Sequence, residues 1–462
     1  MKNLTLQILA DVTGGEYVGD EPGRRTYIKG AVRDNRDVRP GDLFVCIQGE
    51  RVDGHSFANS AFASGAAACL AEKPIPDAAG PYILVESTLE ALKKAGAYYR
   101  RQFDIPFIGI TGSVGKTTTK ELIAAVLGVR YKVLKTPANL NNEIGVPLTL
   151  LGLDDSYEIA VIEMGIGDFG EMSILAEIVL PDIMVITKIG YSHLETLGDL
   201  NGVLRAKSEV FKYMPSGGVA ILSGDDSILR AYDPGMKKIT FGSDPRCEYR
   251  AENIHTSGTD AVSFDVTNDS FPGFEVTIPS YGSHLAALAP AAVAAGRLFG
   301  MTEDDIRQGF LSYVPVGGRA RVVHTGSITI IDDCYNSNPH SVMSALESLS
   351  ELPGRHVAIL GDMFELGALS DELHRKTGVM AADCNTDILL CAGDKAADIY
   401  EGFLSVRGAE RGKDSRYYSD KTALINDLGS IIKKGDVVLV KASHAMGFED
   451  ILPHLRYFGE NG

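Results

Sequence analysis

Long apolar runs and paired cysteines are missing from this sequence of 462 residues. No stretch approaches the length of about 18 apolar residues that a membrane-spanning helix needs, so we expect no membrane insertion. The N-terminal segment MKNLTLQILADVTGG lacks a basic start followed by a long apolar run, so it does not resemble a signal peptide. The six cysteines show no C-x-x-C and no paired spacing. We therefore expect reduced core cysteines in a cytoplasmic protein.

Basic residues are also in deficit, since 44 Lys and Arg face 61 Asp and Glu and the net charge is −17. This balance argues against a general nucleic-acid partner and against an anionic membrane surface. An anionic substrate would have to be held by local cations and metal ions. Hydrophobic residues make up 45% of the chain, which is ample for packed cores.

Internal repeats and low-complexity tracts are absent, and the chain instead alternates short apolar runs with helical patterns. Such alternation is typical of α/β domains with parallel sheets. YVPVGGRAR (313–321) carries proline and paired glycine, which favours a domain boundary there. We predict three α/β domains: a small N-terminal domain (1–86), a central P-loop ATPase-like domain with a mostly parallel sheet (87–316) and a C-terminal Rossmann-like domain (317–462).

A glycine-rich stretch, GITGSVGKTTTKE (109–121), lies between an apolar run typical of a buried strand and a helical pattern. Gly112 and Gly115 would let backbone N–H groups approach phosphate oxygens at a helix N-terminus. Lys116 would reach the terminal phosphates, and the Thr117 hydroxyl would reach a Mg²⁺ ion. The strict loop has its first glycine at the position where this chain has isoleucine, so an ordinary glycine-rich turn is the alternative.

Together with this loop, four further segments resemble the Mur ligase family, the ATP-dependent amide-forming enzymes of peptidoglycan synthesis. They are TPANLNNEIGVPLTLL (136–151), ITKIGYSHLETLG (186–198) with RAKSEV (205–210), IDDCYNSNPHSV (331–342) and ILGDMFELG (359–367). The resemblance runs nearly end to end and keeps the family's domain order. T-G-x-x-G-K-T is the family's own form of the phosphate loop.

The resemblance implies a reaction in cytoplasmic cell-wall precursor synthesis. ATP would phosphorylate the terminal carboxylate of UDP-N-acetylmuramoyl-tripeptide, and the amine of D-alanyl-D-alanine would attack the acyl phosphate, with ADP and phosphate as products. The N-terminal domain would bind the UDP-sugar and the central domain ATP. The C-terminal domain would close over ATP and bind the incoming dipeptide, and we expect a monomer.

Two other readings remain open at this point. One keeps the fold and changes the substrate, as in another Mur-type or folylpolyglutamate-type ligase. The D-M-x-E-L-G string and the lack of D-N-P-R argue against the family member that adds the third residue. The other is a degenerate, non-catalytic scaffold that binds the UDP-peptide, against which the intact set of Lys116, Thr117, Glu163, His193 and Lys207 argues.

The resemblance also implies two Mg²⁺ ions. Thr117 and Glu163, the latter at the end of the predicted strand IAVIEMG, would serve as ligands, because sites of α/β proteins gather at strand carboxyl ends. His193 would bind the second ion. A capping or solvated glutamate and an ordinary surface or core histidine are the alternatives.

Lys207, in RAKSEV, lies on a predicted helix, and the family carries a carbamylated lysine at the matching position. Addition of CO₂ turns an ammonium group into an anionic ligand that can support a metal ion. A solvated helix lysine is the alternative, and Arg205 and Lys212 are further candidates nearby. With Arg319, the resemblance gives the catalytic set Lys116, Lys207, His193, Glu163 and Arg319.

By the same resemblance, two groups of residues contact ATP and the other substrates. Arg319 would reach the γ-phosphate when the third domain closes, with an exposed arginine as the alternative. For the asparagines of 139–142, a turn-forming role is the alternative to substrate contact. For the polar cluster after the predicted strand ITII, which includes Asp332, the alternative is a simple Asx-rich turn. The predicted ATP contacts are Gly112, Ser113, Val114, Gly115, Lys116, Thr117, Thr118, His284, Arg319, Asp333 and Asn336. The predicted substrate contacts are Arg36, Gly49, Asn139, Asn141, Asn142, Glu143, Tyr335 and Asn338.

Five positions depart from the family's usual strings: Asn35, Lys188, Leu285, Leu288 and His444. The usual H-N-x-x-N becomes His284 to Leu288 with both amides replaced by leucine. Leucine can pack on a base but cannot hydrogen-bond to it, so we expect a weaker preference for ATP over GTP. The alternative is that both leucines are helix-core residues.

Overall fold

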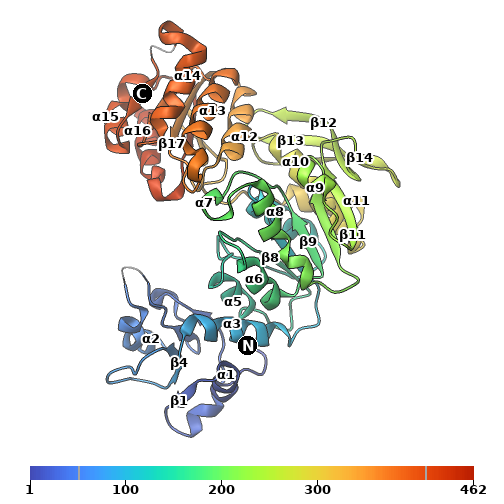
Figure 1. Cartoon of the computed structure of the whole chain (residues 1–462), viewed down its shortest axis with the longest axis vertical. Helices are drawn as coiled ribbons and strands as arrows, with labels where there is room; N and C mark the ends of the chain where they lie inside the picture. The colour runs from blue at the N-terminus through green and yellow to red at the C-terminus, as the bar shows by residue number, and fades with distance from the viewer. Residues whose placement is uncertain (50–51, 412–413, 462) are drawn as a thin grey trace.

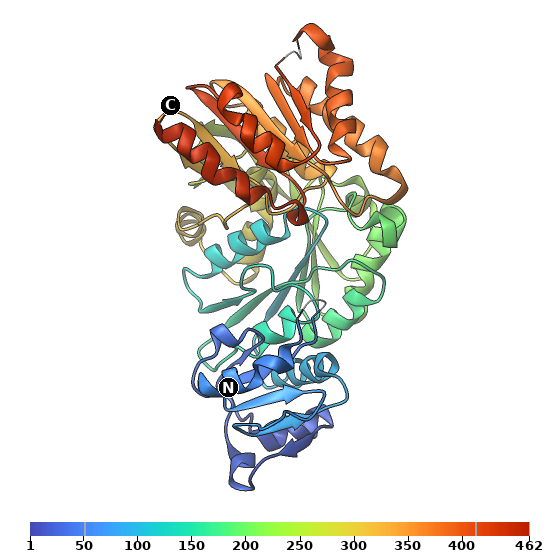
Figure 2. The same cartoon turned by 90° about the vertical axis from the view of Figure 1, so that its left-hand side faces the viewer.

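The computed structural model describes residues 1–49, 52–411 and 414–461. Three sheets follow one another along the chain, and Figures 1 and 2 show them as three stacked parts with the N-terminal part at one end and the C-terminal part at the other. The predicted three-domain α/β architecture is confirmed, whereas the domain borders stay predictions. No helix in the described ranges is both long enough and apolar enough to cross a membrane.

The N-terminal part is a five-stranded sheet in the order β1-β5-β4-β3-β2, with only β1 antiparallel to its neighbour. Helix α3 leads from this sheet into the central part. The elements are α1 (Leu6–Thr13), β1 (Glu16–Val18), β2 (Ala31–Val32), β3 (Leu43–Val45), α2 (Ala58–Ala63), β4 (Ala68–Ala71), β5 (Tyr82–Leu84) and α3 (Thr88–Arg100).

The central part is a nine-stranded sheet in the order β14-β13-β12-β11-β10-β9-β6-β8-β7. Its strands are β6 (Phe107–Thr111), β7 (Val133–Lys135), β8 (Ile159–Glu163), β9 (Ile183–Ile186), β10 (Val219–Ser223), β11 (Lys237–Gly242), β12 (Tyr249–Ser257), β13 (Ala261–Asn268) and β14 (Phe271–Ile278). Its helices are α4 (Lys116–Leu127), α5 (Gly145–Leu150), α6 (Glu171–Val179), α7 (Leu194–Leu197), α8 (Leu200–Ser208), α9 (Ser227–Ala231), α10 (His284–Leu298) and α11 (Glu303–Leu311).

Two kinds of strand meet in this sheet. Every residue of β6, β8 and β9 is buried, because helices cover both faces of the parallel region, and these strands read as continuous apolar runs. Strands β12 to β14 form an antiparallel meander, and β13 alternates buried and half-buried residues, as expected of a strand with one open face. The sequence analysis did not predict this meander.

The C-terminal part is a six-stranded sheet in the order β15-β16-β20-β17-β18-β19, parallel except for the edge strand β15. This arrangement fits the predicted Rossmann-like winding. The elements are β15 (Arg321–His324), β16 (Thr329–Asp332), α12 (Pro339–Ser350), β17 (Arg355–Gly361), α13 (Ser370–Asp383), β18 (Ile388–Ala392), α14 (Ala396–Arg411), β19 (Arg416–Tyr418), α15 (Lys421–Ile431), β20 (Asp436–Lys441) and α16 (Ile451–Asn461). Short 3₁₀ turns include η4 (Glu209–Lys212), η5 (Gly367–Leu369) and η6 (His444–Met446).

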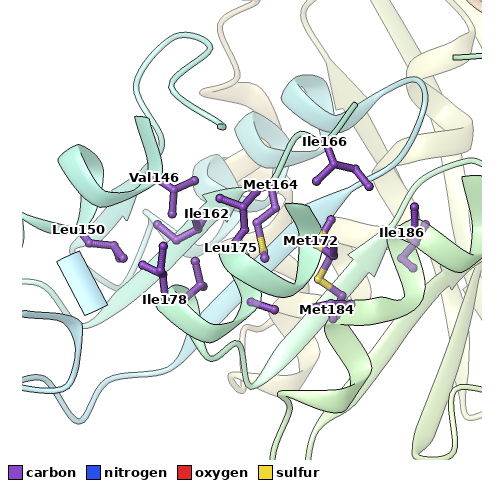
Figure 3. Packing of buried hydrophobic residues seen from close by; sticks show 14 of the residues in the cluster. Val146, Leu150, Ile162, Met164, Ile166, Met172, Leu175, Ile178, Met184 and Ile186 are labelled. Atoms are coloured by element: carbon purple, nitrogen blue, oxygen red, sulfur yellow. The ribbon is translucent and has the colours of Figure 1, made fainter. Parts of the chain in front are cut away.

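The core of the central part holds its strands in place on both faces. Figure 3 shows Val146 and Leu150 of α5 and Leu175 and Ile178 of α6 pointing toward Ile162 of β8. On the other face, α4 packs against α10 and α11. The carboxyl ends of β6, β8 and β9 therefore meet at one fixed edge of the sheet, where the segments after them lie close together.

Candidate active site

A cleft of about 440 Å³ lies between the central and C-terminal parts. The central part contributes the loop after β6, the ends of β8 and β9 and the start of α10, and the C-terminal part contributes residues from 318 to 348 and Lys441. Of the predicted site residues, the cleft is lined by Ser113, Val114, Gly115, Lys116, Thr118, Asn141, Glu163, His193, His284, Arg319, Asp333, Tyr335, Asn336 and Asn338. Two domains thus bring together residues that lie far apart in the sequence.

The predicted phosphate loop is a strand-to-helix turn between β6 and α4, as the sequence indicated. Gly112 and Gly115 have φ angles of 144° and 84°, which favour glycine. A Cβ on Gly112 would lie 2.0 Å from Thr187 Oγ1, so a side chain does not fit there. The Ser113 hydroxyl donates to the Gly190 carbonyl oxygen at 3.0 Å and ties the loop to the segment after β9.

Lys116 starts helix α4 and points back over the loop, where its Nζ donates to the Gly112 carbonyl oxygen at 2.6 Å. Burial lowers the pKa of Lys116, and the positive charge of Arg319 lowers it further while Glu163 opposes the shift. Lys116 and Arg319 therefore lie close enough to feel each other, although they belong to different domains. An anion placed between them would relieve this repulsion.

Glu163 ends strand β8 and is fully buried, so the alternative of a solvated glutamate is excluded. The Thr117 hydroxyl donates to both carboxylate oxygens at 3.1 and 3.0 Å, and Asn141 Nδ2 donates to Oε1 at 2.8 Å. Lys120 Nζ lies 3.7 Å from Oε2. The described ranges contain no cluster of three or more His, Cys, Asp or Glu side chains close enough together to hold a metal ion.

A hydroxyl and a carboxylate are oxygen donors of the kind that Mg²⁺ prefers. Mg²⁺ usually takes one or two protein oxygens and completes its shell with water and substrate phosphates. Thr117 and Glu163 therefore fit one such ion beside the phosphate loop, even without a larger cluster of protein ligands.

His193 precedes helix α7 and has a φ of 53°, a value that is uncommon outside glycine. Its Nδ1 lies 2.6 Å from Glu365 Oε2, a carboxylate of the C-terminal part. The hydrogen bond to His193 lowers the pKa of Glu365. The histidine is therefore held across the domain boundary rather than in a single domain.

Lys207 lies near the end of α8 and is only 1% exposed, so the alternative of a solvated helix lysine is wrong. No hydrogen bond or ion pair links it to another described residue. Burial lowers its pKa well below the usual value, and the charge of Lys116 adds to the shift. Of the neighbouring candidates, Arg205 is exposed and lies over the Phe169 ring at 5.0 Å from its centroid.

On the C-terminal side of the cleft, the Arg319 guanidinium lies over the Tyr335 ring at 4.2 Å from its centroid. Asp333 accepts from Lys441 Nζ at 2.6 Å and from the Ala320 N–H at 3.1 Å. The same Lys441 donates to the Asn336 carbonyl oxygen at 2.9 Å. The polar cluster is thus an ordered network rather than a simple Asx-rich turn, although Asn338 also caps helix α12.

At the start of α10, His284 is half-buried and its Nδ1 has no hydrogen-bond partner among the described residues. Burial lowers its pKa. Leu285 is 2% exposed and belongs to the core, so at this position the helix-core alternative is correct. Leu288 is only half-buried and packs over Gly115 of the phosphate loop.

The other predicted substrate residues do not line this cleft, although Asn139 lies near Tyr335, which does. Asn142 accepts from the Gly145 N–H at 3.0 Å, so it has the turn-forming role that was its alternative. Arg36 is exposed and pairs with Asp34 in the N-terminal part. Figure 1 shows the N-terminal part as a whole at the opposite end of the molecule from the C-terminal part. Asn139 and Glu143 belong to the segment between β7 and α5, and Gly49 lies at the edge of the described N-terminal residues. Their roles stay predictions.

The sequence analysis missed several residues at or near the site, and Lys120 and Glu365 matter most for the argument. Lys120 is fully buried, donates to the Thr136 carbonyl oxygen at 2.7 Å and lies beside Glu163. Its signal was its position one helical turn after Lys116. Glu365 lay inside the quoted D-M-F-E-L-G string, but only the fold shows that it reaches His193.

Comparison with known proteins accounts for this arrangement. Three family models match: the Mur ligase family catalytic domain over residues 28–100, the Mur ligase middle domain over 110–296 and the Mur ligase glutamate ligase domain over 318–444. The UDP-N-acetylmuramoyl-tripeptide–D-alanyl-D-alanine ligase of Bacillus subtilis is 36% identical, over 98% of both chains. Its Escherichia coli counterpart is 34% identical over the full length of both.

Solved structures agree with these relatives. A crystal structure of MurF from Acinetobacter baumannii superposes with a TM-score of 0.86 at 30% identity, covering 98% of each chain. The MurF ligase of Thermotoga maritima in complex with ADP gives a TM-score of 0.79 at 30% identity, over 93% of this chain and 97% of that one. On the strength of this likeness along nearly its whole length, the chain belongs to the Mur ligase family.

Proposed function

We propose that this chain is the ATP-dependent ligase that joins D-alanyl-D-alanine to UDP-N-acetylmuramoyl-tripeptide in peptidoglycan precursor synthesis. One observation carries the proposal. The phosphate loop and Arg319 face each other across an inter-domain cleft, in a chain that resembles ligases of this name from end to end. ATP as the phosphate donor is supported by the ADP bound to the Thermotoga maritima relative.

The cleft provides positive charge where two anions must meet. A carboxylate and the γ-phosphate repel each other, so the reaction needs cations that are already in place. We assign Lys116 to the β- and γ-phosphates and Arg319 to the γ-phosphate. The nearby phosphates would favour the charged form of Lys116, whose pKa is lowered in the protein alone.

Thr117 and Glu163 would hold one Mg²⁺ ion beside the phosphate loop, and His193 would serve the second ion that the family resemblance implies. When bound, the ions would neutralise phosphate charge. The protein's part is to keep the Glu163 carboxylate buried and oriented, with Asn141 Nδ2 donating to Oε1 and Lys120 Nζ lying 3.7 Å from Oε2.

Lys207 is the proposed carbamylation site. A neutral amine adds CO₂ to give a carbamate anion and releases one proton, so an amine that is neutral near physiological pH reacts most readily. The burial of Lys207 and the charge of Lys116 both favour the neutral amine. The carbamate would then carry a negative charge beside Lys116 and would be paired with Lys116 or a metal ion.

Phosphate release by the purified protein tests the proposal, with ATP, Mg²⁺, UDP-N-acetylmuramoyl-tripeptide and D-alanyl-D-alanine present. We expect release only when all four are present, and mass spectrometry should show the pentapeptide product. One control omits D-alanyl-D-alanine. The other replaces it by L-lysine or diaminopimelate and uses the UDP-dipeptide as the acceptor.

Turnover with those replacement substrates, or with glutamate and a folate, would favour another ligase of the same fold. Binding of the UDP-peptide without any phosphate release would favour the scaffold. Either result contradicts the proposed activity.

A further inference from the structure

The loop at residues 190–195 of the central part contacts the C-terminal part at two points. The Tyr191 ring stacks on the His340 ring, with centroids 5.1 Å apart and an angle of 22° between the planes. Two residues further on, His193 Nδ1 lies 2.6 Å from Glu365 Oε2. The Leu194 N–H also donates to the Glu365 carbonyl oxygen at 2.9 Å, so both the backbone and the side chain of Glu365 meet this loop.

The segment that carries Glu365 is hydrogen-bonded to other residues of the C-terminal part. In the segment before it, the Met363 N–H donates to His374 Nε2 at 2.9 Å and the Phe364 N–H donates to the Ser443 hydroxyl at 3.0 Å. Glu365 itself has a φ of 64°, which is uncommon outside glycine and persists only where the surroundings impose it. Both partners of the contact, His193 and Glu365, are therefore aimed at each other by constrained backbones.

The close approach of the two domains also limits the residues beside Glu365. Gly367 has a φ of 55°, and a Cβ there would come within 3.3 Å of the Glu195 Cα. The end of the D-M-F-E-L-G string is thus shaped to lie against helix α7. This gives the string a structural task that is separate from ATP or dipeptide contact.

The chemistry of the pair determines which nitrogen of His193 is free. An ionised carboxylate only accepts hydrogen bonds, so Nδ1 must carry the proton that Glu365 accepts. In the neutral ring, Nε2 then keeps its lone pair. A histidine that binds a metal through one nitrogen commonly donates its other N–H to a carboxylate, which fixes the tautomer and the ring orientation.

We propose that Glu365 is a positioning residue that orients His193, with Nε2 free, so that the metal site is complete only when the C-terminal domain is seated on the loop at 190–195. The inference rests on the proposed metal role of His193. The side chains of His193 and Glu365 are 32% and 57% exposed, so the pair adds little to stability. Its effect is on geometry, which separates it from a merely structural contact.

Nitrogen NMR of the full-length protein labelled at histidine tests the tautomer directly, without metal or substrate. His193→Ala assigns the signals among the ten histidines. In the unsubstituted protein we expect a protonated Nδ1 and a bare Nε2. Glu365→Ala should give a mixture of tautomers, and Glu365→Gln an intermediate result, because an amide oxygen still accepts but carries no charge.

Glu195→Gln is the matched control. It removes the same charge from an exposed side chain two residues from His193, and it should leave the tautomer unchanged. An unprotonated Nδ1 in the unsubstituted protein, or the same tautomer after Glu365→Ala, would overturn the proposal. Neither outcome depends on which ligase reaction the protein catalyses.

The second readout is the affinity for Mn²⁺ in the presence of a non-hydrolysable ATP analogue. Binding is measured as the decrease of the EPR signal of the free ion. Loss of a carboxylate partner of a metal-binding histidine typically costs 10- to 100-fold in affinity or activity, so we expect at least a ~10-fold loss for Glu365→Ala. Affinity within twofold of the unsubstituted protein would refute the positioning role. If His193→Ala also left Mn²⁺ binding unchanged, the metal role of His193 would be refuted as well. The ligase assay would still test the proposed activity independently.

Discussion

Lys120 of helix α4 and Lys207 of helix α8 are both buried in the central domain, but only Lys120 has hydrogen-bond and ion-pair partners among the described residues. Lys120 donates to a backbone carbonyl oxygen at 2.7 Å and lies 3.1 and 3.7 Å from the carboxylates of Glu121 and Glu163. Lys207 has no hydrogen bond or ion pair with another described residue, and the charge of Lys116 lowers its pKa more than the more weakly acting Glu171 raises it. A buried cation with partners can hold a structure together, whereas one without partners costs stability and becomes a neutral amine. We therefore infer a structural role for Lys120 and a chemical one for Lys207.

The largest expected effect is on turnover, and it tests the chemical role of Lys207. Lys207→Ala should leave no detectable turnover, because it removes the amine that is proposed to form the carbamate. Short carboxylates such as acetate should restore part of the activity by supplying the missing anion. Lys212→Ala, on the neighbouring turn η4, is the control and should remain active. Turnover of Lys207→Ala within threefold of the unsubstituted enzyme would contradict the assignment.

The next largest expected effect is a difference in stability between variants that lack Lys120 and variants that lack Lys207. Lys120→Met would leave the buried Glu163 carboxylate without its cation, and breaking a buried pair typically costs about 3–5 kcal/mol. Lys207→Met would remove an unpaired buried amine and should be neutral or stabilising. Chemical denaturation of both variants measures the free energy of unfolding. Equal losses for the two would mean that their different surroundings do not matter.

Lys116 acts on Lys207 and is itself acted on by Glu163. Its charge lowers the pKa of Lys207, while the Glu163 carboxylate favours the charged form of Lys116. Lys116→Ala should lower turnover by a hundredfold or more, about 3 kcal/mol of transition-state stabilisation, because one phosphate clamp is lost. Circular dichroism should show an unchanged fold. Lys188→Ala, at another lysine on the cleft, provides a comparison, and an equal loss there would show that Lys116 has no special role.

The pH dependence of stability should also distinguish Lys207. In the unfolded chain its pKa is about 10.4, and in the folded protein the pKa is lowered well below this. Between the two values the folded state binds fewer protons, so the free energy of unfolding rises with pH, by at most about 1.4 kcal/mol per pH unit for one proton. In CO₂-free buffer, Lys207→Met should show a shallower rise than the unsubstituted protein. Identical slopes would contradict the lowered pKa.

The smallest effect concerns Leu288, which lines the cleft over Gly115 where an amide is usual in the family. Leu288→Asn should sharpen the preference for ATP over GTP by about tenfold, because one net hydrogen bond is worth about 1 kcal/mol or slightly more. The ratio of kcat/KM for the two nucleotides measures it. A wild-type preference above about a thousandfold, unchanged by the substitution, would show that the base is read elsewhere.

Local patterns were sufficient for much of this protein. Continuous apolar runs placed β6, β8 and β9, and the glycines of 112–115 placed the phosphate turn, because these features depend on neighbours in the sequence. Helix α10 runs through Pro290 without a break. The alternation in β13 was equally visible, but the meander that it belongs to went unpredicted.

Burial and contacts between domains were beyond the reach of local patterns. RAKSEV reads the same whether Lys207 is solvated or buried, and only the packing of α8 makes it buried and unpaired. The string HLAAL likewise does not say that Leu285 enters the core while Leu288 faces the cleft.

By itself, the sequence determined the three α/β domains, the phosphate loop and the family, since strand and helix periodicity and short motifs are local properties. The tertiary structure decided which charges meet. It placed Arg319 near Lys116, Glu365 on His193 and Lys120 beside Glu163, and it left Lys207 without an ion-pair partner among the described residues. The physical reason is that the cost of burying a charge depends on what surrounds it in space, and those neighbours come from distant parts of the chain.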